Sequence, residues 1–304
     1  MNICLFSGSS NQAFAQQVAD HLGIALSKST TQKFREGNLM VRLDEPVRGK
    51  DVFIIQTIGL DPNNELMELL FFIDAARRAS AKSICAVVPY FSYAKGDKLD
   101  EPQTSIRAKV CSDRLEVAGI DPLVMMDLHA PQIEGFFRVP VDHLSGRSVL
   151  AEAIKGKLDR PVVFSPDAGF VKDARKFAAL LEADIAIGDK VRRDHSENPD
   201  MLEIIGEVEG KDIIIVDDFA ITGNTLYKAA AQLKDMGANQ ILAAISHCLL
   251  DEAAVKALDK SQIEQLFILD TVANSATNSP KITVVSATKL FADQIRAMQA
   301  KEVK

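Results

Sequence analysis

Residues 213–226 read IIIVDDFAITGNTL, and this stretch decides the fold class of the 304-residue chain. Four β-branched aliphatic residues in a row predict a buried strand. After two carboxylates and a short polar loop, Leu226, Ala230 and Leu233 recur with helical spacing. A buried strand that leads through a polar loop into a helix is the building unit of α/β proteins with parallel sheets.

The same alternation runs along the rest of the chain. Further strand candidates are residues 3–6, 52–56, 84–88, 122–127, 162–165, 241–246 and 265–269, with helix-period segments between them. Gly23, Gly119 and Gly237 follow helical segments, at the place where a left-handed C-terminal cap is favoured. The sequence therefore predicts an α/β fold with mainly parallel sheets flanked by helices.

A weak internal repeat indicates two domains. The strand at 52–55, a polar loop, a helix through Arg78 and the strand at 84–88 parallel the strand at 213–216, a polar loop, a helix through Met236 and the strand at 241–245. A domain size of about 150 residues gives the same count. We expect an N-terminal domain of residues 1–143 and a C-terminal domain of residues 144–304, with the last helical segment able to pack on either half.

The composition is that of a globular protein rather than of a disordered chain or a coiled coil. Hydrophobic residues make up 47% of the chain and charged residues 25%, while 35 Lys and Arg against 42 Asp and Glu leave a net charge of −7. An acidic protein has no general basic surface with which to coat nucleic acid or an anionic membrane. We therefore expect neither as a partner, whereas anionic substrates can still bind at local sites.

The four cysteines, Cys4, Cys85, Cys111 and Cys248, are widely spaced and form no CxxC pair. We expect buried, reduced thiols rather than disulfides or a zinc site. The first basic residue is Lys28, and no apolar run reaches the ~18 residues that span a bilayer, so neither a signal peptide nor a transmembrane helix is expected. These features predict a cytoplasmic protein.

The polar loop at 217–225 has the composition of a ligand site. In an open α/β sheet, ligands bind beyond the carboxyl ends of the strands. Residues 222–225 can offer backbone N–H groups and two hydroxyls to a phosphate monoester at a helix N-terminus. Asp217 and Asp218 can accept hydrogen bonds from sugar hydroxyls beside that phosphate. A capped helix with solvated acids is the simpler interpretation, but a cap needs only one Asp or Thr.

This loop resembles the phosphoribosyl-diphosphate loop of type I phosphoribosyltransferases and of ribose-phosphate pyrophosphokinases. Other stretches resemble the pyrophosphokinase family in order and spacing, namely EPVRGKDVFIIQT at 45–57, LMELL at 66–70, MDLHA at 126–130 and SPDAG at 165–169. The resemblance covers the chain up to its last helix. It implies two similar type I phosphoribosyltransferase-like domains, the first for ATP and the second for ribose 5-phosphate. It also implies a homo-oligomer, either a dimer or a larger assembly.

The resemblance implies a reaction and a metal. The family transfers the β,γ-diphosphoryl group of ATP to the C1 hydroxyl of ribose 5-phosphate, giving 5-phosphoribosyl 1-diphosphate and AMP. Mg²⁺ is the implied cofactor, and His129 on the nucleotide side and Asp167 on the ribose side match the family's metal residues. Hard oxygen ligands and a phosphate-bridged ion suit magnesium.

Two cations and one loop carry the implied roles in the C-terminal half. Lys190 and Arg192 match the family's catalytic pair, which closes over the transferring group and stabilises its charge. The residues implied to bind ribose 5-phosphate are Arg192, Asp217, Asp218, Ile221, Thr222, Gly223, Asn224 and Thr225. By composition alone, the segment around Lys190 is a solvated surface loop.

The ATP-binding residues implied in the N-terminal half are Phe34, Glu36, Gly37 and Asn38 in an adenine-reading turn, and Lys95, Gly96 and Asp97 in a triphosphate-contacting segment. Several of them depart from the family pattern. Lys95-Gly96 stands where an Arg-Gln pair is usual, and Arg107 replaces a small Ser or Thr. In the phosphate loop, Ile221 replaces a common Asp and Asn224 a common Gly.

These departures keep three alternatives open. A catalytically impaired paralogue that regulates an active synthase would explain the altered ATP segments, although Lys190 and Arg192 are present. A phosphoribosyltransferase would explain the loop at 217–225, although such enzymes generally need only one such domain. A non-enzymatic nucleotide-binding module is compatible with the fold alone.

Overall fold

The computed structural model describes residues 2–190, 202–276 and 278–301. These residues form two compact units. Unit 1 comprises Met1–Ser145, Asp270–Ala273 and Ala287–Lys304, and unit 2 comprises Gly146–Leu269 and Asn274–Ser286. This partition differs from the expected division at 143/144 because the end of the chain returns to unit 1.

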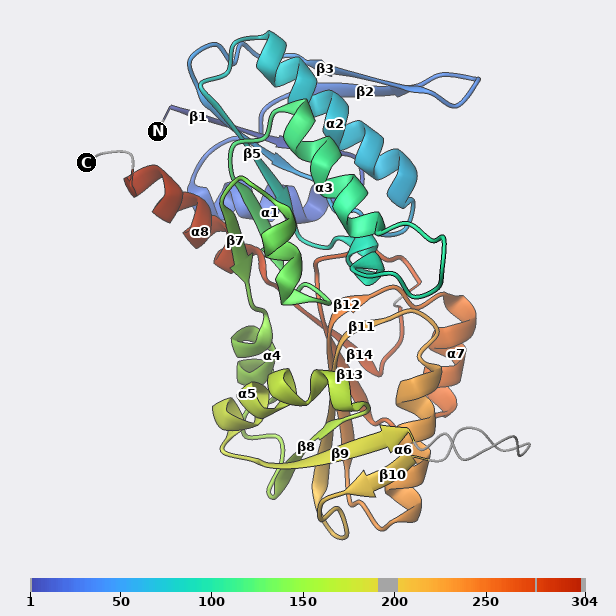
Figure 1. The fold of residues 1–304 in the computed structure, drawn as a ribbon. Coiled ribbons are helices and arrows are strands. Elements are labelled where there is room, and N and C mark those ends of the chain that lie inside the picture. The colour runs from blue at the N-terminus through green and yellow to red at the C-terminus, as the bar shows by residue number, and fades with distance from the viewer. Residues whose placement is uncertain (1, 191–201, 277, 302–304) are drawn as a thin grey trace. The chain divides into compact units, whose positions relative to one another are not determined.

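Unit 1 contains the elements from β1 to β7 and the last helix (Figure 1). Their bounds are β1 Ile3–Ser7, α1 Gln12–Leu22, β2 Ser29–Lys33, β3 Leu39–Leu43, β4 Asp51–Ile55, α2 Pro62–Arg78, β5 Ser83–Val88, η1 Ser92–Gly96, α3 Arg107–Ala118, β6 Leu123–Met126, η2 Pro131–Phe136, β7 Val141–Leu144 and α8 Thr288–Lys301. Five strands form one parallel sheet in the order β1-β4-β5-β6-β7. β2 and β3 form a separate antiparallel hairpin.

The two faces of the unit 1 sheet are covered by different helices. Phe6, Val52 and Ile54 share a buried core with residues of α2 and α3. Side chains alternate along a strand, so the buried Leu5 and Phe53 point to the other face. On that side α1 packs on α8, where the ring of Phe14 meets the ring of Phe291 edge-on at 5.3 Å between centroids.

This packing explains why the last helix belongs to unit 1. The α8 side chains Phe291, Ala292 and Ile295 are fully buried. At its start, the backbone N–H of Ala287 donates to Asp270 Oδ1 at 2.8 Å. The apolar face of α8 thus packs on α1. The helical periodicity of the sequence predicts the apolar face but not the partner that covers it.

Unit 2 contains a larger sheet. Its elements are α4 Arg147–Ile154, β8 Pro161–Ser165, η3 Ala168–Phe170, α5 Val171–Leu181, β9 Asp184–Lys190, β10 Leu202–Ile205, β11 Asp212–Ala220, α6 Asn224–Asp235, β12 Ile241–Cys248, α7 Glu252–Lys260, β13 Gln265–Leu269 and β14 Ile282–Val285. The strand order is β10-β9-β8-β11-β12-β13-β14. Only β10 is antiparallel to its neighbour among these described strands.

The predicted α/β fold with mainly parallel sheets is confirmed, and each of the eight strand candidates overlaps a strand. One boundary was wrong in a way that bears on the site. The strand expected at 213–216 continues to Ala220, because it pairs with β12 beyond the end of β8, with Asp217 opposite Ile245 and Phe219 opposite His247. The two carboxylates therefore lie on the strand rather than in the loop after it.

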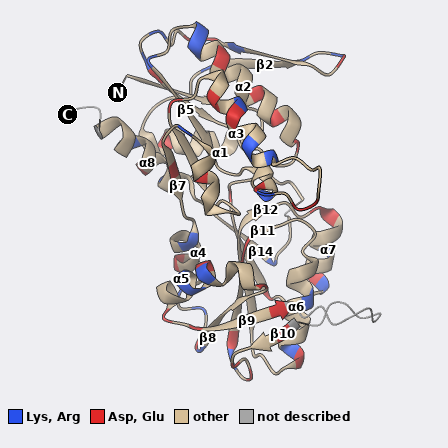
Figure 2. Ribbon diagram, in the orientation of Figure 1, with Lys and Arg blue, Asp and Glu red and all other residues tan. Residues whose placement is uncertain are grey.

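Two further expectations can be compared with the structure. All four cysteines are free and buried, as predicted. Among the described residues, no helix combines the length and the apolar character that a bilayer crossing requires. Figure 2 shows acidic and basic residues interspersed over the elements of each unit.

Candidate active site

The carboxylate pair Asp217 and Asp218 lies near the carboxyl end of β11 in unit 2. Asp217 Oδ1 accepts a hydrogen bond from the Asp218 backbone N–H at 3.0 Å, and Asp218 Oδ1 accepts one from the Phe219 N–H at 2.9 Å. Burial raises the pKa of Asp217 well above its usual range, and the neighbouring charge of Asp218 raises it further. A cation or a hydroxyl donor that binds here relieves this repulsion.

The loop after β11 and the start of α6 present polar groups to solvent. Thr222, Asn224 and Thr225 are exposed, and no side chain caps the N-terminus of α6. Thr222 Oγ1 accepts only a long hydrogen bond, 3.5 Å, from the Asn224 N–H. The first N–H groups of a helix carry a partial positive charge, so this end of α6 suits an anion.

Gly223 is the residue that shapes this loop. Its φ of +69° lies in the left-handed region, and a Cβ there would strike the ring and hydroxyl of Tyr227. Tyr227 is held in place because its hydroxyl donates to the Ala254 carbonyl at 2.9 Å. The close approach of the tyrosine and the positive φ together require glycine.

Asp167 lies beside this pair in unit 2. It caps η3, where its Oδ1 accepts from the Phe170 N–H at 3.0 Å. β8 and β11 are neighbours with Phe164 opposite Ile215, and the charge of Asp167 contributes to the raised pKa of Asp217. The structure thus brings together the predicted metal residue and the predicted ribose-binding acids.

Lys190 is the last residue of β9, which runs parallel to β8 with Ile187 opposite Ser165. The carboxyl ends of β9, β8 and β11 therefore lie at one edge of the sheet, and this edge carries Lys190, Asp167 and Asp217. Arg192, the other predicted catalytic cation, lies outside the described residues.

In unit 1, two segments follow neighbouring strands of the sheet. Lys95 and Gly96 belong to η1, after β5, and His129 follows β6. The Gln132 side chain, in η2, donates to Asp97 Oδ2 at 3.1 Å and so ties the two segments together. His129 is exposed. The predicted triphosphate segment and the predicted metal histidine are thus neighbours within unit 1.

A histidine that the sequence analysis did not single out holds the backbone before His129. Asp127 has a φ of +38°, which is rare for a residue other than glycine. The next N–H, that of Leu128, donates to His143 Nε2 at 2.9 Å, and His143 Nδ1 lies 2.7 Å from Glu134 Oε1. This network assigns the ring proton to Nδ1. Only the fold could reveal this role, because the sequence pattern does not show that the loop after β6, η2 and β7 bring these three groups together.

The predicted adenine-reading residues stand apart from the others. Phe34, Glu36, Gly37 and Asn38 form the exposed tip of the β2–β3 hairpin, where the Phe34 N–H donates to the Asn38 carbonyl at 2.9 Å. The hairpin projects away from the sheet and from α3 (Figure 1). Within unit 1, the structure does not bring the tip together with Lys95 or His129.

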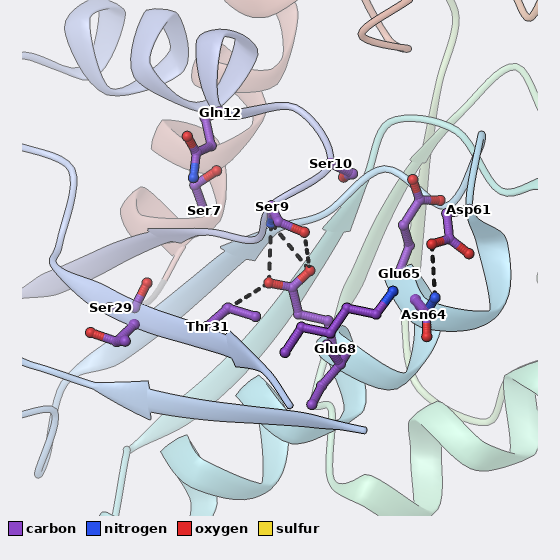
Figure 3. A pocket seen from close by; sticks show the side chains of 13 residues that line it. Ser7, Ser9, Ser10, Gln12, Ser29, Thr31, Asp61, Asn64, Glu65 and Glu68 are labelled. Carbon is purple, nitrogen blue, oxygen red and sulfur yellow. Dashed lines mark hydrogen bonds between the residues drawn. The ribbon is translucent and has the colours of Figure 1, made fainter. Parts of the chain in front are cut away.

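A cavity of about 640 Å³ lies at the carboxyl ends of β1 and β4, and none of the predicted site residues lines it. Figure 3 shows the buried carboxylate of Glu68 at its floor, where Glu68 accepts hydrogen bonds from Ser9 and from Thr31, the latter at 2.6 Å. Gln56 donates to the same carboxylate at 2.8 Å. The carboxylate in this cavity is thus bonded to neighbouring side chains.

The residues present fit a magnesium ion that arrives with its substrates. Among the residues that the structure describes, no three His, Cys, Asp or Glu side chains converge as a ready-made metal cage. Magnesium is usually held by one or two carboxylates with waters and substrate phosphates. The carboxylates at the edge of the unit 2 sheet and the imidazole of His129 could each supply one or two such ligands.

Comparison with known proteins finds matches to one enzyme family in both halves of the chain. Residues 3–119 match the family described as the N-terminal domain of ribose phosphate pyrophosphokinase, and residues 172–304 match the phosphoribosyl synthetase-associated domain. A ribose-phosphate pyrophosphokinase from Helicobacter pylori strain ATCC 700392 / 26695 is 42% identical over 299 residues, which are 98% of this chain and 93% of the relative. Ribose-phosphate pyrophosphokinase 1 of Lactococcus lactis is 42% identical over 97% of this chain and 92% of its own length.

A solved structure has the same fold throughout. The phosphoribosylpyrophosphate synthetase from Mycobacterium smegmatis superposes with a TM-score of 0.93 at 35% identity, covering 99% of this chain and 100% of that one. The likeness therefore extends through both units and includes α8.

Proposed function

The chain belongs to the ribose-phosphate pyrophosphokinase family, and from this premise we propose how its residues divide the reaction. The enzyme transfers the β,γ-diphosphoryl group of ATP to the C1 hydroxyl of ribose 5-phosphate, with 5-phosphoribosyl 1-diphosphate and AMP as products. Unit 1 binds ATP and unit 2 binds ribose 5-phosphate.

The observation that carries the ribose assignment is the pair Asp217 and Asp218 beside the uncapped start of α6. The N–H groups and hydroxyls of 222–225 bind the 5-phosphate, since a helix N-terminus favours an anion. The carboxylates accept hydrogen bonds from the ribose hydroxyls, and each such bond stabilises the charged form of Asp217 that burial disfavours.

In unit 1, Lys95 and Asp97 bind the triphosphate, and the hairpin tip with Phe34, Glu36, Gly37 and Asn38 binds adenine. Because the tip projects away from the other ATP residues of its own unit, it favours a homo-oligomer in which one copy completes the ATP site of the next. This arrangement would make the isolated monomer inactive.

On the ATP side Mg²⁺ would be held by His129, and on the ribose side by Asp167, in each case together with substrate phosphates and water. When bound, it neutralises phosphate charge and orients the β-phosphorus for attack. The chain's own part is to fix these two ligands. His143 does so for the loop that carries His129, and the η3 turn does so for Asp167.

Lys190 and Arg192 stabilise the charge that develops on the transferring group. Lys190 is well placed for this because it ends a strand at the same sheet edge as Asp167 and Asp217. We place the reaction in the cytoplasm, where four reduced cysteines are the usual state.

An assay of the purified protein with ribose 5-phosphate, Mg²⁺ and, separately, ATP, GTP, CTP and dATP tests the function. AMP and 5-phosphoribosyl 1-diphosphate are expected with ATP. Lys190→Ala should lower kcat by roughly 100-fold or more with KM nearly unchanged, because the lysine acts on charge that is present only in the transition state.

Lys176→Ala, which removes an exposed cation of α5, is the matched control and should leave kcat unchanged. Comparable turnover of Lys190→Ala and Lys176→Ala would refute the catalytic role of Lys190. No nucleoside monophosphate from any donor would instead favour a regulatory subunit.

A further inference from the structure

The side chain of Arg107 lies directly against Gly96. A Cβ built on Gly96 would lie 2.8 Å from Arg107 Cβ and 3.1 Å from Arg107 Cζ, with Arg107 Nε still closer. Real side chains do not approach to such distances. A side chain at position 96 and this placement of Arg107 therefore exclude each other.

Arg107 is not placed there to stabilise its helix. It is the first residue of α3, and the N-terminal end of a helix disfavours a positive charge. α3 has neither a capping side chain nor an acidic residue in its first turn to offset that charge. No carboxylate of the described residues pairs with Arg107. The guanidinium is exposed and is left with no anion from unit 1.

The surroundings of Arg107 supply the other donors that a polyphosphate needs. Arg107 lines a cavity of about 410 Å³ together with Lys98, Thr104 and Ser105. Asp100 and Glu101 line it too, and Figure 2 shows both signs of charge around the start of α3. A cavity of mixed charge favours an anion that carries a divalent cation, because the carboxylates can then face the cation's water shell.

We propose that Arg107 binds the polyphosphate of magnesium-bound ATP, and that Gly96 is small so that the guanidinium can lie over η1. This inference rests on the proposed function of unit 1. The planar cation that η1 lacks thus comes from the first turn of α3. Unlike Lys95, the guanidinium can grip two phosphate oxygens at once.

The test is a double-mutant cycle on the full-length protein with Arg107→Thr, Gly96→Gln and the combination of both. Arg107→Thr should raise KM for ATP roughly 10- to 100-fold, the range expected for loss of a charge-assisted hydrogen bond, with KM for ribose 5-phosphate unchanged. Gly96→Gln should do the same by displacing Arg107. The double variant should be no worse than either single variant, because both changes remove one interaction. Arg114→Thr, on an exposed position of the same helix, should change neither constant.

Equilibrium binding of magnesium-bound ATP, measured alongside, separates this inference from the proposed function. If the wild type binds ATP and Arg107→Thr weakens that binding, the assignment of Arg107 holds even if no product forms. Unchanged ATP binding in Arg107→Thr, equal losses for both substrates, or additive losses in the double variant would overturn it, as would a wild type that binds no ATP. The melting temperature of Arg107→Thr should not fall, since the substitution removes a cation from a positive helix end.

Discussion

The loop between β4 and α2 in unit 1 and the loop between β11 and α6 in unit 2 occupy corresponding positions in the two halves of the internal repeat. Each follows a buried central strand and leads into a helix. In unit 1, the first polar residue, Gln56, is fully buried. Its amide donates to the Glu65 carbonyl at 3.1 Å and to Glu68 at 2.8 Å, and its oxygen accepts from the Ser10 hydroxyl at 2.8 Å.

In unit 2, the corresponding loop keeps its polar groups for a ligand. Asp217 and Asp218 stand side by side at a cost that shows in the raised pKa of Asp217, and Thr222 and Asn224 are exposed. The comparison teaches that one scaffold position can serve either purpose. Where the polar groups bond to one another they stabilise the fold, and where they repel or face solvent they are available to substrate. The five predictions below test this contrast.

The largest effect is expected for Asp217→Asn. We expect kcat/KM for ribose 5-phosphate to fall roughly 100-fold, because a hydrogen bond from a sugar hydroxyl to a charged acceptor is lost. The free energy of unfolding at pH 7 should rise, since a repulsive charge is removed. Asp235→Asn, at the exposed end of α6, is the control. A variant that keeps full activity would contradict the ribose assignment.

The same variant has a pH signature. The pKa of Asp217 is raised in the folded protein, so the unfolded chain ionises first as pH rises from its ordinary value of 3.8. Wild-type stability therefore falls as pH rises from that value up to the folded pKa. Urea unfolding across this range should show that this fall is smaller in Asp217→Asn.

Glu68→Gln should lower the free energy of unfolding by about 2 kcal/mol, whereas Asp217→Asn should raise it. The reason is that the amide cannot accept from Ser9, Thr31 and Gln56 as the carboxylate does. Equilibrium unfolding in urea at pH 7 measures the loss. Asp74→Asn, which breaks only the exposed pair with Arg78, should change stability by less than about 0.5 kcal/mol. Equal stability of the two variants would mean that the Glu68 network adds nothing.

Gly223→Ala and Gly59→Ala compare the two loops at their glycines. Gly223→Ala should cost about 1 to 2 kcal/mol of stability, since the positive φ is strained for alanine and its Cβ meets Tyr227. Gly59 has no positive φ, and a Cβ there would lie 3.3 Å or more from the side chains of Thr57, Tyr90 and Val272, so its variant should lose less. Thermal unfolding of both variants measures the difference. The contrast between the loops fails if Gly59→Ala is the more costly change.

The smallest effect is expected for Glu65→Gln. Burial raises the pKa of Glu65, although its Oε2 accepts the Gly59 N–H at 2.6 Å. Because the folded pKa is raised, the wild type loses a little stability as pH rises from the ordinary value of 4.5 to the folded pKa. The glutamine oxygen can still accept from Gly59, so stability at pH 7 should change by no more than about 0.5 kcal/mol. Urea unfolding at several pH values between 4 and 7 measures this. The free energy of unfolding should vary less with pH in Glu65→Gln than in the wild type.

Much of the fold was readable from the sequence because its signals are local. The apolar runs predicted eight strands, and the alternation with helices predicted parallel sheets. Two of the strands that went unnoticed have weak local patterns. β2 reads STTQK and is mostly exposed, and β7 reads VDHL and is half-buried along its length. β2 is formed by pairing with β3 in a hairpin and β7 by pairing with β6, not by apolar runs of their own.

The candidate site divides in the same way. Asp217, Asp218 and Gly223 could be selected from the sequence, because the residue types and their order within one loop already indicate phosphate and sugar binding. His143 could not, since its role depends on a backbone N–H and a carboxylate from two other segments. Arg107 and Gly96 were each noticed as departures, but nothing in their spacing of eleven positions indicates that they touch.

The sequence by itself determined the α/β class, the family and the loop that carries Asp217 and Asp218, because these follow from hydrophobic period and from contiguous motifs. Only the tertiary structure decided that α8 packs in unit 1, that β11 extends to Ala220 and that Arg107 fills the space over Gly96. The physical reason is that periodicity specifies which face of an element is buried, whereas the partner that buries it is chosen by packing between residues distant in the chain.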